Sequence, residues 1–332
     1  MPVNMYPLKF KPYLRTMVWG GEKIAPYKGI YTTRNRIGES WELSSVEGHV
    51  SEVANGPFAG KSLTEVMQRW KSGLVGRKAW KETGIEFPLL VKFIDARADL
   101  SIQVHPGDEL AARTNPGQRG KTEMWYVVGA DKGARLLSGL TQEITPEEYE
   151  ERVRDNSITE VLARYDVSKG DVFFLPAGRI HAIGAGSFVA EIQQTSDITY
   201  RIYDYGRLGL DGKPRQLHIE QAKEAIDYRV FPDYRTTYPH LKDKEVPLVS
   251  CRYFDTSLFD LGHRVEKDLS GLDSFVVVIC VEGGGSLVDS ESDGLEYYLP
   301  LRQGETVLVP ASSRRLTLIP DGSMTCLASS LP

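Results

Sequence analysis

Hydrophobic residues along this chain gather in short runs, and these runs favour β-strands. The runs are rich in β-branched and aromatic residues, and turn sequences such as PGD, PAG and EGGG separate them. Many short strands at close spacing are typical of β-barrels and β-sandwiches. We therefore predict a mainly β protein whose clearest strands are Phe87–Ile94, Trp125–Val128, Val172–Leu175, Phe275–Val281 and Thr306–Val309.

Three segments instead show helical signals. Ser62–Trp70 begins with a serine that is followed three residues later by glutamate, the pattern of a capping box. Thr145 precedes a proline and two glutamates, which favour a first helical turn, and we expect this helix to continue through Asp155–Tyr165. The segment His218–Tyr228 predicts a third helix. The first two helices should be insertions beside the β scaffold.

Composition and charge narrow the range of partners. The 332 residues are 41% hydrophobic and 26% charged, as in ordinary globular proteins, and the formal net charge is −5. Proteins that bind nucleic acid usually carry a basic excess, so no nucleic-acid partner is expected. No apolar run is long enough to cross a bilayer, and the N-terminus lacks a signal-peptide pattern. Three scattered cysteines without a CxxC pair fit a reducing compartment, so we expect a cytoplasmic protein with no membrane partner.

Four residues carry the pattern of a metal site. In the segment LSIQVHP, alternation along a strand puts Gln103 and His105 on one face and apolar residues on the other. Glu123 opens a hydrophobic strand, where an unpaired carboxylate is costly unless another charge compensates it. His181 follows a Pro–Gly turn that should join two strands. Imidazole and carboxylate ligands suit zinc, and the weaker amide ligand of Gln103 would leave room for water or substrate.

The turn motif and its neighbours resemble a known family. The spacing G-x5-P-x-G-x2-H over Gly170–His181 resembles the second motif of the cupin superfamily, and the other three residues resemble its first motif in variant form. The resemblance implies a cupin-type β-barrel, or jelly roll, with helical insertions. Longer stretches that cover most of residues 1–230 resemble the type I mannose-6-phosphate isomerases, namely Trp19–Gly21, Gly38–Glu42, Phe87–Pro106, Lys121–Val128 and Gly170–Arg207.

This resemblance also implies an activity and roles for single residues. Members of the family are zinc-dependent isomerases that interconvert mannose 6-phosphate and fructose 6-phosphate. By motif, Arg201 would be the active-site arginine, and one zinc ion per chain would be held by Gln103, His105, Glu123 and His181. Because an arginine stays protonated, we expect Arg201 to stabilise the negative charge of an enediolate rather than to act as the base.

The sugar phosphate should contact further residues near the same motifs. The resemblance favours Ser101 and Lys121 for substrate binding, and three more candidates accompany them, Lys92, Trp19 and Glu191. Glu191 could equally orient His181 from behind. The proton-transfer base remains open among Glu191, Lys121, Asp204 and His218.

Two other functions are compatible with parts of the pattern. His105, Glu123 and His181 alone would make the two-His-one-carboxylate triad of a non-haem iron dioxygenase, although Gln103 as an extra ligand counts against it. A non-catalytic sugar-binding cupin would need no intact metal site. Whichever of the three functions applies, we expect the protein to be a monomer or a homodimer.

The C-terminal part predicts a second domain without metal. Residues 231–247 are rich in Pro, Tyr and charge, and we interpret them as a linker. It would join a catalytic metal-binding domain, residues 1–235, to a C-terminal β domain, residues 236–332. The Gly-x5-Pro spacing recurs from Gly304 to Pro310, with Arg315 where the ligand histidine would fall. We therefore expect a degenerate cupin-like domain that kept the strands and lost the ligand.

Overall fold

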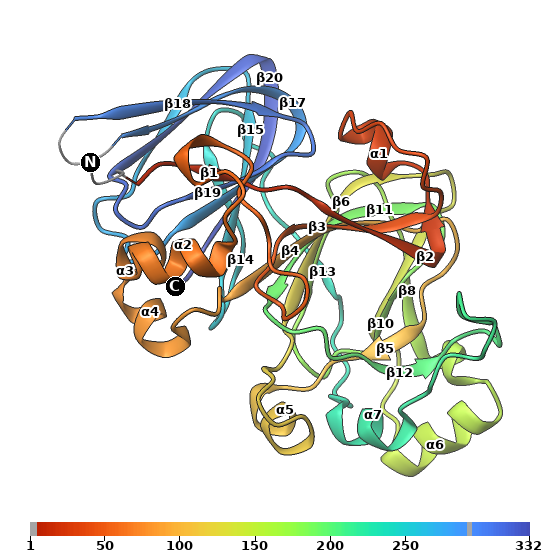
Figure 1. The fold of residues 1–332 in the computed structure, drawn as a ribbon. Coiled ribbons are helices and arrows are strands. Elements are labelled where there is room, and N and C mark those ends of the chain that lie inside the picture. The colour runs from red at the N-terminus through yellow and green to blue at the C-terminus, as the bar shows by residue number, and fades with distance from the viewer. Residues whose placement is uncertain (1–4, 291–293) are drawn as a thin grey trace. The chain divides into compact units, whose positions relative to one another are not determined.

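The computed structural model describes residues 5–290 and 294–332, and the chain divides into two compact units (Figure 1). The division after Thr236 lies beside the boundary expected from the sequence. Two N-terminal segments nevertheless belong with the C-terminal strands, in part because β1 (Leu8–Lys9) pairs with β19 (Thr306–Val309). Unit 1 comprises Met1–Tyr13, Trp41–Leu90 and Thr237–Pro332, and unit 2 comprises Leu14–Ser40 and Val91–Thr236.

Unit 1 contains an antiparallel sheet of eight strands within the described residues. Its order is β1-β19-β17-β20-β15-β14, and β16 and β18 pair with β20 and β17. The long strands β17 and β20 contribute apolar side chains to a buried core. The remaining bounds are Glu245–Ser250 (β14), Asp255–Leu261 (β15), Val265–Asp268 (β16), Val276–Ser290 (β17), Glu296–Arg302 (β18) and Arg315–Ser330 (β20).

A group of short helices belongs to the same unit. The helix α2 (Leu63–Trp70) begins where the sequence predicts, and its capping box is present. The hydroxyl of Ser62 accepts the backbone N–H of Glu65 at 3.2 Å, and the Glu65 carboxylate accepts the backbone N–H of Ser62 at 2.8 Å. Three further short helices are η1 (Gly56–Phe58), α3 (Ser72–Val75) and α4 (Arg77–Thr83).

Two further antiparallel sheets, which lie mostly in unit 2, provide the strands of the candidate site. Their orders are β13-β9-β6-β11-β4-β3-β2 and β12-β5-β10-β7-β8. The first sheet consists of Tyr13–Gly21 (β2), Ile37–Leu43 (β3), Leu89–Asp95 (β4), Glu123–Ala130 (β6), Val172–Leu175 (β9), Ser187–Gln194 (β11) and Arg235–Thr236 (β13). The second consists of Ile102–Val104 (β5), Arg135–Leu140 (β7), Leu162–Asp166 (β8), His181–Ile183 (β10) and Tyr200–Tyr203 (β12).

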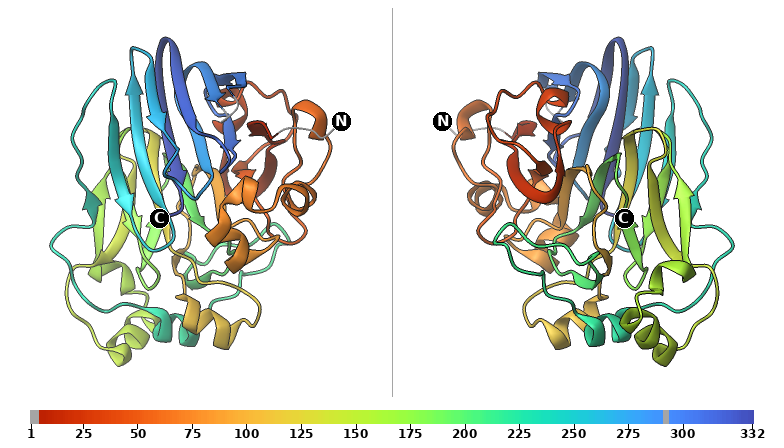
Figure 2. Two further views of the ribbon diagram at one scale, coloured as in Figure 1. Left: turned by 90° about the vertical axis from the view of Figure 1, so that its left-hand side faces the viewer. Right: turned by 90° about the vertical axis from the view of Figure 1, so that its right-hand side faces the viewer.

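The helices of unit 2 are short. Helices α6 (Pro146–Arg154) and α7 (Ile219–Ala225) lie side by side at one end of this unit in both views of Figure 2. The Tyr149 hydroxyl of α6 donates to the Ile219 carbonyl at 3.2 Å, and Lys223 of α7 lies 2.6 Å from the Glu150 carboxylate. The unit also contains α1 (Ile24–Tyr27), α5 (Asp108–Thr114) and the 3-10 helix η2 (Ile158–Val161).

One predicted element is wrong in its second half. The helix that begins after Thr145 ends at Arg154, and Asp155–Tyr165 does not continue it. The Asp155 carboxylate accepts the backbone N–H of Ser157 at 2.9 Å, and Asn156 has a φ of 66°. Both features stop a helix, since a side chain takes the N–H and the left-handed backbone turns the chain. The chain then forms the one-turn 3-10 helix η2 and enters β8, which pairs with β7.

The mainly β architecture is confirmed, with antiparallel pairing in all three sheets. Each of the five predicted apolar runs overlaps a strand, although β4 begins two residues after Phe87, and β17 begins one residue after Phe275 and extends beyond Val281. The antiparallel sheets match the cupin-like fold that the resemblance implies, and within the described residues their pairings do not close into one barrel. No helix of the described residues is long and apolar enough to cross a membrane.

Candidate functional site

Three neighbouring strands align polar side chains in one row. In β5, Ile102 and Val104 are fully buried, and the alternation of a strand turns Gln103 to the opposite face. The register of the sheet sets Gln103 opposite His181 of β10 on one side and Arg201 of β12 on the other. Side chains at paired positions lie on the same face of a sheet, so these three belong to one surface.

The other two residues of the predicted site come from different places. Glu123 is the first residue of β6, in the sheet that does not contain β5. His105 follows β5 directly, and its carbonyl accepts the backbone N–H of Gly178 at 2.9 Å. Gly178 has a φ of 89°, which favours glycine, in the turn that delivers His181 to the start of β10. The predicted turn is therefore present and fixes where the histidine enters.

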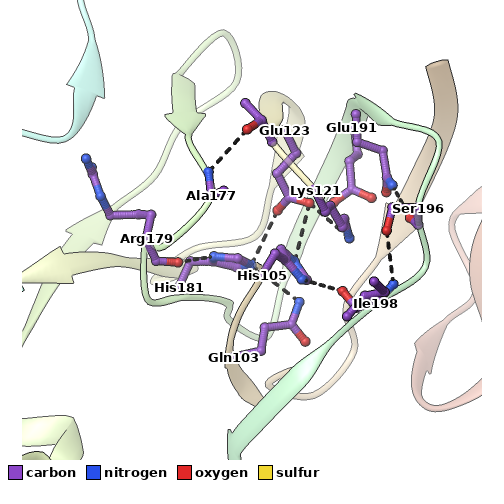
Figure 3. A network of polar contacts seen from close by, with 12 residues as sticks. Gln103, His105, Lys121, Glu123, Ala177, Arg179, His181, Glu191, Ser196 and Ile198 are labelled. Carbon is purple, nitrogen blue, oxygen red and sulfur yellow. Dashed lines mark hydrogen bonds and ion pairs between the residues drawn. The ribbon is translucent and has the colours of Figure 1, made fainter. Parts of the chain in front are cut away.

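The structure brings His105, Glu123 and His181 into one buried cluster (Figure 3). Nε2 of His181 lies 3.3 Å from Oε1 of Glu123, and Nε2 of His105 lies 3.6 Å from Oε2 of Glu123. Two ligand atoms at zinc distances of about 2.0–2.1 Å and at a tetrahedral angle lie about 3.4 Å apart. The separations therefore fit ligands that share one ion.

Gln103 reaches the same cluster through its amide. Its Nε2 lies 3.4 Å from Nε2 of His181, and its Oε1 lies 3.4 Å from the hydroxyl of Ser101. As a metal ligand the amide would present its oxygen, which a half turn about the terminal bond achieves because the two ends of an amide have the same shape.

Both imidazoles are oriented by backbone carbonyls. Nδ1 of His105 donates to the Ile198 carbonyl at 2.7 Å, and Nδ1 of His181 donates to the Arg179 carbonyl at 2.8 Å. A carbonyl can only accept, so the proton is on Nδ1 and the lone pair of Nε2 faces the cluster. Such partners fix the tautomer of metal-binding histidines. Arg179, rather than the suggested Glu191, therefore orients His181.

The cluster has the electrostatic character of a metal site. Glu123 is 0% exposed, and its Oε1, like Nε2 of His105, has no hydrogen-bond partner among the described residues. Burial lowers the pKa of His105 well below its usual value and that of His181 to about 4, so both stay neutral. Burial also raises the pKa of Glu123. Lys121 contacts Oε2 of Glu123, but Oε1 and the Nε2 atoms of the two neutral imidazoles offer one another only lone pairs, which a divalent cation would bind.

Two lysines and a second buried glutamate surround the cluster. Nζ of Lys121 lies 3.0 Å from Glu123, and Nζ of Lys92 lies 3.4 Å from Glu191. Burial opposes the charge of Lys121, but three carboxylates, Glu123, Glu191 and Asp197, outweigh it and raise the pKa of Lys121. Burial similarly opposes ionisation of Glu191, but the lysines outweigh it and lower its pKa. Glu191 also accepts the indole N–H of Trp125 at 2.9 Å.

A cavity of about 280 Å³ opens beside this network. Ligand sites for small molecules typically start at about 300 Å³, so its size suits one small substrate. Gln103 and Arg201 line it, and so do all the residues that the sequence suggested for substrate binding: Ser101, Lys121, Lys92, Trp19 and Glu191. The structure thus gathers the predicted substrate-binding residues at one cavity, which His105, Glu123 and His181 do not line, and contacts with a substrate stay a prediction.

Arg201 is held in the cavity wall by neutral partners. Its Nε donates to the Ser101 hydroxyl at 3.3 Å, and its Nη1 donates to the Gln216 carbonyl at 2.9 Å. Its backbone N–H donates to Nδ1 of His218 at 3.2 Å. Burial and the nearby positive charges of Arg215 and Arg207 lower the pKa of Arg201. The guanidinium is therefore a fixed cation in surroundings that do not fully balance it.

The candidates for the base separate into two groups. Lys121, Glu191 and His218 line the cavity, whereas Asp204 does not line it and is bound by two arginines. Sequence reasoning missed four charged residues of the cavity wall, Arg15, Glu39, Asp197 and Arg215. Glu39 and Asp197 had a signal, because they lie in Gly38–Glu42 and Gly170–Arg207, two segments that support the family resemblance.

Among its described residues, unit 1 offers no second cluster of this kind. Across residues 5–290 and 294–332, the His105, Glu123 and His181 group is the one place where three or more potential ligands converge. Arg315 begins β20 after the turn that follows β19, as the repeat predicts, and its guanidinium lies 3.7 Å from Glu296.

The comparisons with known proteins all find the same family. Residues 8–154 match the family model described as phosphomannose isomerase type I, catalytic domain. The chain is 34% identical over 328 residues to mannose-6-phosphate isomerase ManA of Bacillus subtilis (strain 168), covering 98% of this chain and 99% of that protein. It is 39% identical over 319 residues to the probable mannose-6-phosphate isomerase GmuF of the same organism, covering 94% and 96%.

A solved structure shows the same fold. The crystal structure of the mannose 6-phosphate isomerase from Bacillus subtilis superposes with a TM-score of 0.86 at 30% identity, covering 98% of this chain and 99% of that chain. The similarity therefore extends over both units rather than over the metal cluster alone.

Proposed function

The chain belongs to the type I mannose-6-phosphate isomerase family, and from that premise we propose that it interconverts mannose 6-phosphate and fructose 6-phosphate. The observation that carries the proposal is the buried cluster of His105, Glu123 and His181 beside a small cavity with several cationic side chains. A sugar phosphate needs both features, since its carbonyl end must be activated and its phosphate end must be held.

We propose zinc as the resident ion, one per chain. The donors would be two neutral imidazoles, one carboxylate and the amide oxygen of Gln103, a set that suits a borderline divalent cation. When bound, the ion would polarise the sugar oxygens and ease loss of a proton next to the carbonyl. The orphaned atoms Oε1 of Glu123 and Nε2 of His105 support this assignment.

The chain's own residues would orient the sugar and stabilise charge. Moving a carbonyl from C1 to C2 transfers a proton between these carbons and passes through an enediolate with negative charge on oxygen. Arg201 stands beside Gln103 across the sheet register and places a fixed positive group at this cavity. Such a preorganised group stabilises charge without reorganising during the reaction.

A coupled assay with mannose 6-phosphate, before and after removal of metal with a chelator, tests the function. We expect activity that is lost on chelation and restored by zinc. Elemental analysis of the active protein should give one zinc per chain. Absence of turnover in the zinc-loaded protein would contradict the proposed activity, and full activity in metal-free protein would contradict the metal's role.

Reaction in deuterated water tests proton transfer. One ligand cluster serves an enediolate path, whereas a metal-assisted hydride shift is better served by two ions. We expect deuterium at the carbon that receives the proton. Product free of label at low conversion would favour a hydride shift.

Neither alternative function is favoured. The relatives are isomerases over nearly the whole chain, which counts against an iron dioxygenase, and the intact cluster counts against a binding-only cupin. We further propose a cytoplasmic location, because all three cysteines are free thiols, and a monomer or homodimer that binds neither nucleic acid nor membrane. Light scattering of the purified protein measures the oligomeric state.

A further inference from the structure

The segment that follows β12 holds an unusual group of charges. The Asp204 carboxylate, which is 6% exposed, contacts two arginines at once. Arg215 donates to it through Nε at 2.7 Å and through Nη2 at 2.5 Å. Arg207 donates to it through Nε at 2.9 Å. One carboxylate thus holds two guanidinium groups, and one positive charge is left over.

The two arginines differ in what else they face. Arg215 lines the cavity beside Arg201, whereas Arg207 does not line it. Arg207 instead donates to the Asp99 carbonyl and lies over the ring of Tyr205. Because Asp204 takes only Nε and Nη2 of Arg215, its Nη1 keeps two N–H donors for another partner.

The other cations of the cavity are already balanced by carboxylates. Nη1 of Arg15 lies 3.0 Å from Glu39, and Lys92 lies 3.4 Å from Glu191. Lys121 lies 3.0 Å from Glu123, at the metal cluster. Arg201, by contrast, has no carboxylate within 4.0 Å in the part of the chain that the structure describes. Asp197 also lines the cavity, but it lies on the side of Arg15 and Lys92, at 3.8 and 3.9 Å. Arg201 therefore lacks a carboxylate partner, and Arg215 shares its one carboxylate, Asp204, with Arg207.

A phosphate monoester carries about −1.5 to −2 charge at neutral pH, so it would balance the positive charge at Arg201 and Arg215. The fork of a guanidinium also fits two phosphate oxygens at once. We propose that Arg215 binds the phosphate group of the sugar phosphate, and that Asp204 is a positioning residue that aims its guanidinium into the cavity. The inference rests on the proposed function for the identity of the substrate, and it assigns a binding role to a residue outside the motif strands.

The polar residues between the metal cluster and the arginines indicate how the substrate would be oriented. From the metal cluster this row of residues runs through Gln103, Ser101 and Arg201, in contacts of 3.4 and 3.3 Å, toward the arginine group. The carbonyl end of the sugar would lie at the cluster and the phosphate at Arg215. Loss of Arg215 should therefore weaken binding without removing groups from the reacting end.

The test compares Arg215→Gln with Arg207→Gln in the zinc-loaded protein. Both changes remove one arginine from Asp204, but only the first removes a group from the cavity wall. A hydrogen bond to a charged group is worth roughly ten- to a hundredfold in binding. We expect Arg215→Gln to raise KM for mannose 6-phosphate and the inhibition constant of inorganic phosphate by about that factor, with kcat changed by less than about threefold.

In the matched control, Arg207→Gln, KM and the inhibition constant of inorganic phosphate should stay within about threefold of wild type. Equal effects of the two changes would show that Arg215 serves only to bury Asp204, and a loss confined to kcat would also overturn the inference. If Arg215→Gln does not fold, Arg215→Lys keeps a charge but loses the fork, and it should raise KM by an intermediate factor. An unchanged KM in Arg215→Lys would then overturn the inference.

A calorimetric titration with inorganic phosphate separates this inference from the proposed function. If wild type fails to isomerise mannose 6-phosphate, the proposed function falls, but phosphate binding can still be measured. Binding that is weakened in Arg215→Gln and kept in Arg207→Gln supports the anion site in either case. Equal binding in both variants refutes it.

Discussion

Replacing Arg201 by alanine should remove most of the turnover while the metal stays bound. The guanidinium lies in the cavity wall and reaches the metal cluster only through Ser101 and Gln103. Loss of one preorganised donor at a developing negative charge typically costs about 2.7–4 kcal/mol, or roughly a hundred- to thousandfold in rate. We therefore expect kcat to fall by that factor and the zinc content to remain near one per chain.

The structure also sets the expected cost in stability. Arg201→Ala removes the hydrogen bonds to the Ser101 hydroxyl at 3.3 Å and to the Gln216 carbonyl at 2.9 Å. Each such bond is worth about 0.5–1.5 kcal/mol, so the free energy of unfolding should fall by roughly 1–3 kcal/mol. That loss lowers Tm by a few degrees and leaves the protein folded at assay temperature.

The assay measures kcat, zinc per chain and Tm for three proteins beside wild type. Arg201→Lys keeps the charge without the planar fork, so it should recover only part of the turnover. Arg164→Ala is the control, because Arg164 also donates to a backbone carbonyl, Thr159 at 3.3 Å, from a strand of the same sheet but does not line the cavity. Near-normal turnover in Arg201→Ala would refute a role in the reaction.

Three further predictions concern stability and reactivity. Gly139 has a φ of 78°, and a Cβ there would lie 2.2 Å from the Tyr234 ring, so Gly139→Ala should lower the free energy of unfolding by about 2–4 kcal/mol. The control Gly212→Ala, at a φ of 75° in open space, should lower it by only about 1 kcal/mol, and chemical denaturation measures both. Burial raises the pKa of Cys251, and the other two cysteines are buried, so a thiol reagent should modify at most one cysteine in the native chain and all three after unfolding. Burial alone would raise the pKa of Asp204, but its arginine partners outweigh burial and lower this pKa. The stability that wild type has over Asp204→Asn should therefore shrink as the pH falls below about 4, and urea titrations at several pH values would measure it.

The residues of the buried cluster could be predicted because short-range rules govern where they lie. Alternation along β5 sets the side on which Gln103 lies, and the Pro–Gly turn before His181 needs only local backbone geometry. An apolar strand that begins with Glu123 signals a buried carboxylate by itself. Each of these inferences spans fewer than about ten residues, the range over which strand and turn rules hold.

The features that sequence reasoning missed depend on contacts between separate segments of the chain. Local features at Asp155 and Asn156 end the helix, but the strand β8 that follows depends on its partner β7, and a helical reading of Asp155–Tyr165 contains no trace of that partner. Arg215 lies in an irregular loop, where its sequence neighbours give no periodicity that indicates a cavity. The hydrogen bond from Arg215 to Asp204 fixes where Arg215 lies, but the sequence does not indicate that these two residues are in contact. Long-range contacts of this kind override local preference.

The two units show why a turn motif alone does not make a metal site. In unit 2, the turn after β9 delivers His181 beside Gln103 of β5, while Glu123 arrives from another sheet. In unit 1, the turn after β19 delivers Arg315 at the same spacing, but its strand partners are Ser290 and Asp268, and its guanidinium turns toward Glu296. Coordination needs donors from several strands whose charges are otherwise unbalanced. The arginine at this position already has carboxylate neighbours, so placing histidine there, as in Arg315→His, should not create a zinc site unless the facing strands also supply converging donors.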